Sequence, residues 1–191
     1  MAQEQQLKYR ILEDESETFP HPVTGEKITA HRIQALRTFK TRGVGAKWVR
    51  EGDLGGYVSS EKNLAQDGSR WICNGSAALQ NAKVQKSACL SGDSLMFDNT
   101  KLTGSARAAD TTTLLGEVTI KDSAKALGKT QLEGSIVLQD KATVTDTVLQ
   151  ATDEKITIAG SLRGVKGLDD LKLSRSDSHD IFIVSTVCIR P

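Results

Sequence analysis

The chain has 191 residues, of which 38% are hydrophobic and only 4% aromatic, a size that suits one domain with or without an appendage. Its 25 Lys and Arg nearly balance its 24 Asp and Glu, so neither nucleic acid nor an anionic membrane is indicated as a partner. No apolar run reaches the roughly 18 to 20 residues that a membrane span needs. Cys73, Cys89 and Cys188 form no CxxC or Cys/His cluster, which predicts free thiols in a reducing cytoplasm.

The first predicted element is a β-hairpin near the N-terminus. Residues 9–12 (YRIL) and 27–33 (KITAHRI) have strand composition, and the segment from Pro22 to Gly25 has turn composition. Residues 52–56 (GDLGG) follow as a glycine-rich segment. A phosphate-binding loop would need a Gly-Lys-Ser/Thr ending and a following helix, which this segment lacks. We therefore expect a tight turn that docks the hairpin on the next element.

A six-residue repeat then runs without insertion from residue 69 to residue 146, which makes thirteen hexads. Place four is apolar in every hexad, from Ile72 to Val144. Place two is small or β-branched in all but the first hexad, where Arg70 stands. Place six is Gly, Asp or Asn except at Gln80 and Lys86.

This repeat predicts an all-β solenoid. Places two and four lie on the same side of a strand, so both face the interior, while places three and five face outward. Gly, Asp and Asn tolerate the backbone conformations that a corner needs. Three hexads close a triangular turn of about 18 residues, and successive turns stack as a parallel β-helix.

The quoted features resemble a known group of proteins. The hexads are similar to the hexapeptide repeat of left-handed β-helices, and the left hand is implied by that resemblance alone. Residues 31–39 (HRIQALRTF), 52–58 (GDLGGYV) and 63–64 (NL) resemble the opening of phage and prophage β-helix proteins of the YdcK-like type. The resemblance covers most of residues 7–150, and residues 40–50 form a longer link than the pattern has. It implies a phage origin and the cytoplasm of a bacterial host cell.

The two ends of such a solenoid need covers, because unpaired strand edges promote aggregation. We expect an N-terminal β cap over residues 1–62, a left-handed β-helix over 63–152, and C-terminal strands or a cap over 153–191. Strand composition at residues 155–159 and 180–189 supports the last of these.

One outward side of the predicted helix carries an apolar column. Residues 18 apart stack on the same side, and on this side the column is formed by Ala77, Leu79, Leu95, Phe97 and Leu115. A contiguous apolar patch on a soluble protein indicates a contact surface. Two alternatives stay open: an interface with another subunit or partner, or a cover formed by the chain's own cap or C-terminal strand. A neighbouring side that carries Lys83, Lys101 and Lys121 should stay exposed.

Function is predicted from what the coils carry. His21, His31 and His179 all lie outside the hexads, so no general base, metal ligand or cofactor site is expected on the coils. The leading hypothesis is a non-enzymatic protein-interaction module, a homodimer or homotrimer that binds a host or viral protein. An inhibitor of a host defence complex is one concrete form. The alternative is a hexapeptide-type acyltransferase whose acceptor site forms between subunits.

Overall fold

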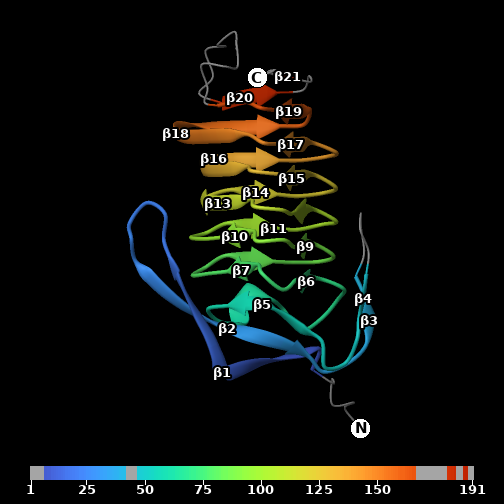
Figure 1. Ribbon diagram of the computed structural model, residues 1–191. Coiled ribbons are helices and arrows are strands. Elements are labelled where there is room, and N and C mark those ends of the chain that lie inside the picture. The colour runs from blue at the N-terminus through green and yellow to red at the C-terminus, as the bar shows by residue number, and fades with distance from the viewer. Residues whose placement is uncertain (1–6, 42–46, 167–179, 184–186, 189–191) are drawn as a thin grey trace.

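The computed structural model describes residues 7–41, 47–166, 180–183 and 187–188. Its strands stack as a β-solenoid of about six turns, each turn lying on the one before it (Figure 1). Adjacent coils pair in parallel: Leu95 pairs with Ala77 on one neighbouring coil and with Thr113 on the other. Since these partners are 18 residues apart, the predicted all-β solenoid with three hexads to a turn is confirmed.

The coils have three sides, and each side is a ladder of short parallel strands. Side 1 is built from β5 (Leu54–Val58), β7 (Ala77–Ala78), β10 (Leu95–Met96), β13 (Thr113–Gly116) and the first halves of β16 (Gln131–Leu138) and β18 (Val148–Ile158). Side 2 is built from β8 (Lys83–Val84), β11 (Lys101–Leu102), β14 (Thr119–Ile120), the second halves of β16 and β18, and β20 (Asp180–Ile183). Side 3 is built from β6 (Trp71–Ile72), β9 (Cys89–Leu90), β12 (Arg107–Ala108), β15 (Lys125–Leu127), β17 (Thr143–Thr145), β19 (Ser161–Arg163) and β21 (Val187–Cys188).

The parallel ladder extends past both expected boundaries of the helix. At the N-terminal end, β5 already pairs in parallel with β7, so the first coil begins before residue 63. At the C-terminal end, β20 pairs in parallel with β18, and β21 pairs in parallel with β19. The described strands after residue 153 therefore continue the solenoid rather than forming a separate cap.

The inward register follows the sequence prediction. Every place-two and place-four residue from Arg70 to Val144 is buried, and the apolar ones form one continuous core along the coil axis. Outward positions of side 2 behave differently, since Lys83 and Lys101 are exposed and Lys121 is half-buried. Alternation along each short strand thus separates a dry core from a wet surface.

Corner residues adopt the left-handed backbone conformation that the turn composition predicted. Seven place-six residues that are not glycine have φ between 50° and 66°, namely Gln80, Lys86, Asp98, Asp110, Asp122, Asp140 and Asp146. At the first corner the left-handed residue is Gly75, one position after Asn74. Aspartate is favoured because its short side chain tolerates this conformation and forms local hydrogen bonds.

The corner aspartates also tie one coil to the next. The backbone N–H of Gly116 donates to Asp98 Oδ2 at 2.7 Å, and that of Gly128 donates to Asp110 Oδ2 at 2.9 Å. In each pair the two residues are 18 apart. A place-six aspartate thus satisfies the corner N–H of the following coil, which would otherwise lack a partner.

Two glycines with nearly equal φ allow the corner geometry to be tested. Gly104 has φ +74°, and a Cβ there would lie 2.7 Å from the Asp122 carbonyl oxygen of the next coil, while Gly25 has φ +72° and open space. Gly25→Ala should lower the free energy of unfolding by about 1 kcal/mol, the cost of the backbone conformation. Gly104→Ala should cost about 3 kcal/mol, because the coils must also separate. Equal losses in urea unfolding would contradict the close stacking of the corners.

An N-terminal hairpin accompanies the first coils and confirms the predicted strands. β1 (Tyr9–Pro20) and β2 (Lys27–Ala35) pair antiparallel, and β2 pairs antiparallel with β5. The register shifts between Leu12 and Ser16, so a bulge divides the hairpin into two halves. A bulge bends a strand pair, and Figure 1 shows the hairpin curving from the N-terminal end to lie alongside the lower coils.

The near half of the hairpin closes the N-terminal end of the core. Tyr9 and Ile33 are buried against the first coil, and the Tyr9 hydroxyl donates to the Leu64 carbonyl oxygen. Lys8 is buried beside them, and its Nζ donates to the carbonyl oxygens of Ala65 at 2.9 Å, Asp67 at 3.2 Å and Arg70 at 3.2 Å. These contacts satisfy polar groups that an open end would expose.

Close approach between β5 and β6 requires glycine. A Cβ on Gly55 would lie 2.8 Å from the Ile72 carbonyl oxygen and 2.8 Å from the Trp71 ring. The expected docking role of the glycine-rich segment is therefore confirmed, although Leu54 to Gly56 form the start of a strand rather than a turn.

Candidate functional site

The predicted apolar column lies on side 1, and the hairpin covers it. Ala77, Leu79 and Phe97 are fully buried, Leu115 is 1% exposed, and Leu95 is half-buried. Their cover is the far half of the hairpin, whose Phe19, Ile28 and Ala30 pack with them in a second apolar cluster.

A polar contact fastens the hairpin to this column. The His21 ring lies 5.1 Å from the Phe97 ring in an edge-to-face arrangement, and its Nε2 lies 3.2 Å from Asp98 Oδ1. His21 Nδ1 accepts the backbone N–H groups of Val23 and Thr24 at 3.2 Å each. Nδ1 thus organises the hairpin turn itself, and Nε2 fastens that turn to the coil.

The contact through Ala77, Leu79, Leu95, Phe97 and Leu115 is therefore made within one chain. Of the two alternatives that the sequence left open, the structure shows the second: the chain's own N-terminal hairpin covers the apolar column. The physical reason is that Phe19 and Ile28 supply apolar area on the far half of the hairpin, beyond the bulge. A homo-oligomer stays a prediction, and it cannot use this column while the hairpin is in place.

The described histidines lie on the hairpin rather than on the coils. His31, on β2, borders a hollow of about 510 Å³ between the hairpin and Val58 to Glu61. Its Nδ1 lies 3.8 Å from Glu13 Oε2, a long contact with an exposed carboxylate. His179 lies outside the described residues. The acyltransferase alternative stays a prediction, and no contact of His21 or His31 favours it.

A cleft of about 250 Å³ opens between side 3 and a short arm of the chain. The arm is an antiparallel pair, β3 (Phe39–Lys40) and β4 (Trp48–Val49). Phe39 anchors it by packing on the buried Trp71 ring at 5.3 Å, and Val49 is buried as well. The arm therefore has a fixed position over the first coils of side 3.

The cleft combines walls from distant parts of the sequence. Thr41, Lys47, Trp48 and Val49 come from the arm, and Asp53 and Leu54 come from the start of β5. Trp71, Cys73, Asn74 and Cys89 come from the first coils of side 3. The sequence did not predict this site, because the arm strands are too short to give a periodic signal.

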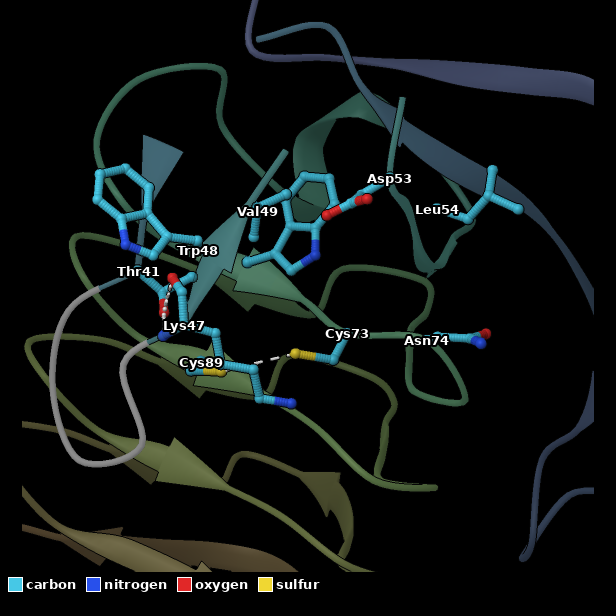
Figure 2. Close-up of a pocket in the computed structure, with 10 residues that line it drawn as sticks. Thr41, Lys47, Trp48, Val49, Asp53, Leu54, Cys73, Asn74 and Cys89 are labelled. Carbon is cyan, nitrogen blue, oxygen red and sulfur yellow. Dashed lines mark hydrogen bonds between the residues drawn. The ribbon is translucent and has the colours of Figure 1, made fainter. Parts of the chain in front are cut away.

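Two large apolar side chains stand at the rim of the cleft. Trp48 is 63% exposed and Leu54 is 40% exposed, although both line the hollow. The ammonium of Lys40 lies 5.8 Å from the centre of the Trp48 ring, a cation–π distance. Figure 2 shows Trp48 and Leu54 on either side of Val49 and Asp53.

Two thiols lie on the floor of the cleft. Cys73 Sγ and Cys89 Sγ are 3.9 Å apart, joined by a hydrogen bond (Figure 2). This bond lowers the pKa of the Cys73 thiol to about 7, and the positive charges of Lys47 and Arg107 act in the same direction. The same bond, together with burial, raises the pKa of Cys89. Free thiols were predicted for these two residues, but their contact was not.

The described residues were compared with the requirements of a metal site and of a membrane-spanning helix. Within residues 7–41, 47–166, 180–183 and 187–188, no three His, Cys, Asp or Glu residues come together as a metal-binding group. The same residues include no helix of the length and apolarity needed to cross a membrane.

No protein-family model matches the chain, and no curated protein matches its sequence.

Proposed function

We propose that the protein is a non-enzymatic protein-interaction module that binds a host or viral protein at the arm cleft. The observation that carries the proposal is Trp48, which is 63% exposed at the rim of a hollow of about 250 Å³. Tryptophan is the side chain most enriched among residues that dominate binding energy. Leu54, which is 40% exposed, adds a second apolar side chain to the lining of the same hollow.

The solenoid supports this role by holding the site in one shape. Trp71 and Cys89 on the cleft floor are paired in the parallel ladder of side 3, which continues through β12 and β15. The arm is fixed on the opposite wall by Phe39 and Val49. Because little ordering is needed on association, a preformed site of this kind loses less entropy when a partner binds.

A finer form of the proposal is inhibition of a host defence complex by a phage accessory protein. Its support is the resemblance of residues 31–39 and 52–58 to the opening of phage and prophage β-helix proteins. In this form the solenoid displays the arm and its cleft to one subunit of the host complex. The partner would cover Trp48 and exclude water from the hollow.

Truncation of Trp48 tests the proposed site. Trp48→Ala should weaken partner binding at least 30-fold, which corresponds to a loss of about 2 kcal/mol, typical of a hot-spot residue. Val23→Ala is the matched control, because Val23 is 62% exposed and lies in the turn of the hairpin. It should leave the dissociation constant within about twofold by surface plasmon resonance. Equal affinity of the Trp48→Ala variant and the unmodified chain would contradict the proposal.

A further inference from the structure

The two thiols of the cleft form a diagonal pair across adjacent coils. Cys89 pairs in register with Trp71, and Cys73 lies two residues beyond Trp71. With strands about 4.8 Å apart and about 3.3 Å of rise per residue, diagonal Cα atoms are about 8 Å apart. The sulfur atoms nevertheless approach to 3.9 Å because both side chains point into the cleft.

The surroundings of this pair are cationic. Lys47 is exposed at the cleft, and Figure 2 shows its side chain beside the two thiols. Arg107 follows Cys89 directly in the ladder of side 3, in register with it. Both cations stabilise a thiolate on Cys73, and the thiolate is the form of cysteine that acts as a nucleophile.

Three kinds of thiol chemistry compete at such a pair. A thiophilic metal ion would need further ligands, which the described residues do not bring to the cleft, and it would meet two neighbouring cations. An internal disulfide requires the sulfurs to close to about 2.05 Å, and pairs with Cα atoms more than about 7 Å apart cannot close without backbone movement. A mixed disulfide with a small external molecule needs neither.

We propose that Cys73 is a site of S-thiolation by a small anionic disulfide that enters the arm cleft. The Cys73 thiolate attacks one sulfur of the reagent R–S–S–R, whose S–S bond breaks. A new S–S bond joins Cys73 to one R–S group, and the other leaves as R–S⁻, so Cys73 is oxidised and the leaving sulfur reduced. The hydrogen bond between the two sulfurs, which Cys89 must donate once Cys73 is ionised, holds Cys73 as a thiolate, and Lys47 and Arg107 attract the anionic reagent. This inference does not depend on the proposed function.

Glutathione disulfide is the probe for the full chain. Intact mass and peptide mapping should show one reductant-sensitive glutathione adduct, on Cys73 rather than on Cys89 or Cys188. At pH 7, native Cys73 should react about threefold faster than the same residue in the denatured chain, since a lower pKa gives more thiolate but a weaker nucleophile. The rate should rise with pH to a midpoint near 7. An internal Cys73–Cys89 disulfide, a first adduct elsewhere, or no adduct would overturn the proposal.

The charge selectivity supplies a second, independent test. Lys47→Gln should slow the reaction with glutathione disulfide about threefold, because an exposed charge within the Debye length raises the local concentration of an anion. The same variant should react no more slowly than the unmodified chain with cystamine, a cationic disulfide. Lys47 is exposed, so unchanged thermal melting is expected and will show that the fold is kept. Equal slowing with both reagents would show that Lys47 acts only on the Cys73 thiolate and would overturn its role in attracting the anionic reagent.

Discussion

Replacing Leu102 by Asp should unfold the solenoid. Leu102 is fully buried and lies in the ladder between Val84 and Ile120 of the adjacent coils. A carboxylate at this place would have neither water nor a partner, and we expect a loss of more than about 4 kcal/mol in the free energy of unfolding. Urea denaturation followed by far-ultraviolet circular dichroism measures this loss.

The matched control is the preceding residue. Lys101 is exposed on side 2 and pairs in register with Lys83. Lys101→Asp introduces the same carboxylate on the outward face and should change the free energy of unfolding by about 0.5 kcal/mol or less. Similar losses for the two variants would show that places three and four of the hexad do not face opposite sides of the strand.

Replacing Phe97 by Ala should release the hairpin from side 1. Phe97 is fully buried between the coil and the far half of the hairpin, with the His21 ring 5.1 Å away. Removing a buried phenyl ring costs about 3 to 5 kcal/mol. We expect this loss to appear first as faster amide hydrogen exchange in Phe19 and Ile28, because the hairpin depends on this contact while the coils keep their own ladder.

Thr103 supplies the control for Phe97. It occupies the same place in the following hexad, on side 2, and is only half-buried. Thr103→Ala should leave hydrogen exchange in the hairpin unchanged and alter the free energy of unfolding by about 0.5 kcal/mol. If Phe97→Ala leaves exchange in β1 and β2 unchanged, the hairpin is held by other contacts than the apolar column.

The coils were predictable from the sequence because each physical requirement recurs every six residues. Burial demands an apolar side chain at place four, as at Leu102 and Leu114, and backbone geometry demands Gly or Asp at place six. Even Lys86, which departs from the composition at place six, adopts φ +57° because the neighbouring coils fix the corner. Because thirteen hexads repeat these two requirements, only one alignment of the sequence on the coils satisfies all of them.

The hairpin strands were predictable, and cover of the apolar column by the N-terminal cap was one of the two alternatives that the sequence left open. The apolar residues of these strands are few, and the alternation of buried residues along β2 shifts by one position in mid-strand. Even-numbered residues are buried in its first half, at Ile28 and Ala30, and odd-numbered residues in its second half, at Ile33 and Ala35. This shift is the signal that one hairpin covers two surfaces, side 1 and the open end of the core. It coincides with the register shifts in the β1–β2 and β2–β5 pairs.

Of the features of the cleft, only the proximity of its two thiols could have been predicted from the sequence. Its roof is an arm of two short strands, Phe39–Lys40 and Trp48–Val49. A strand of two residues is too short to show an alternation of apolar and polar side chains in the sequence. Its thiols are 16 residues apart, and only an 18-residue coil turns that spacing into a diagonal contact. Given the coil length, Cys73 and Cys89 lie at places five and three of one side, so their proximity was recoverable from the register.

Site-specific photo-crosslinking from the arm tests the proposed partner site most directly. A benzophenone side chain would replace Lys47, which is exposed and lines the cleft beside Trp48, in one variant and Val23 in another, and both would be irradiated in host cells. Our account predicts one discrete protein crosslinked from position 47, in amounts comparable to the bait, and none from position 23. Crosslinks from position 23 alone, or no crosslink from position 47, would contradict it.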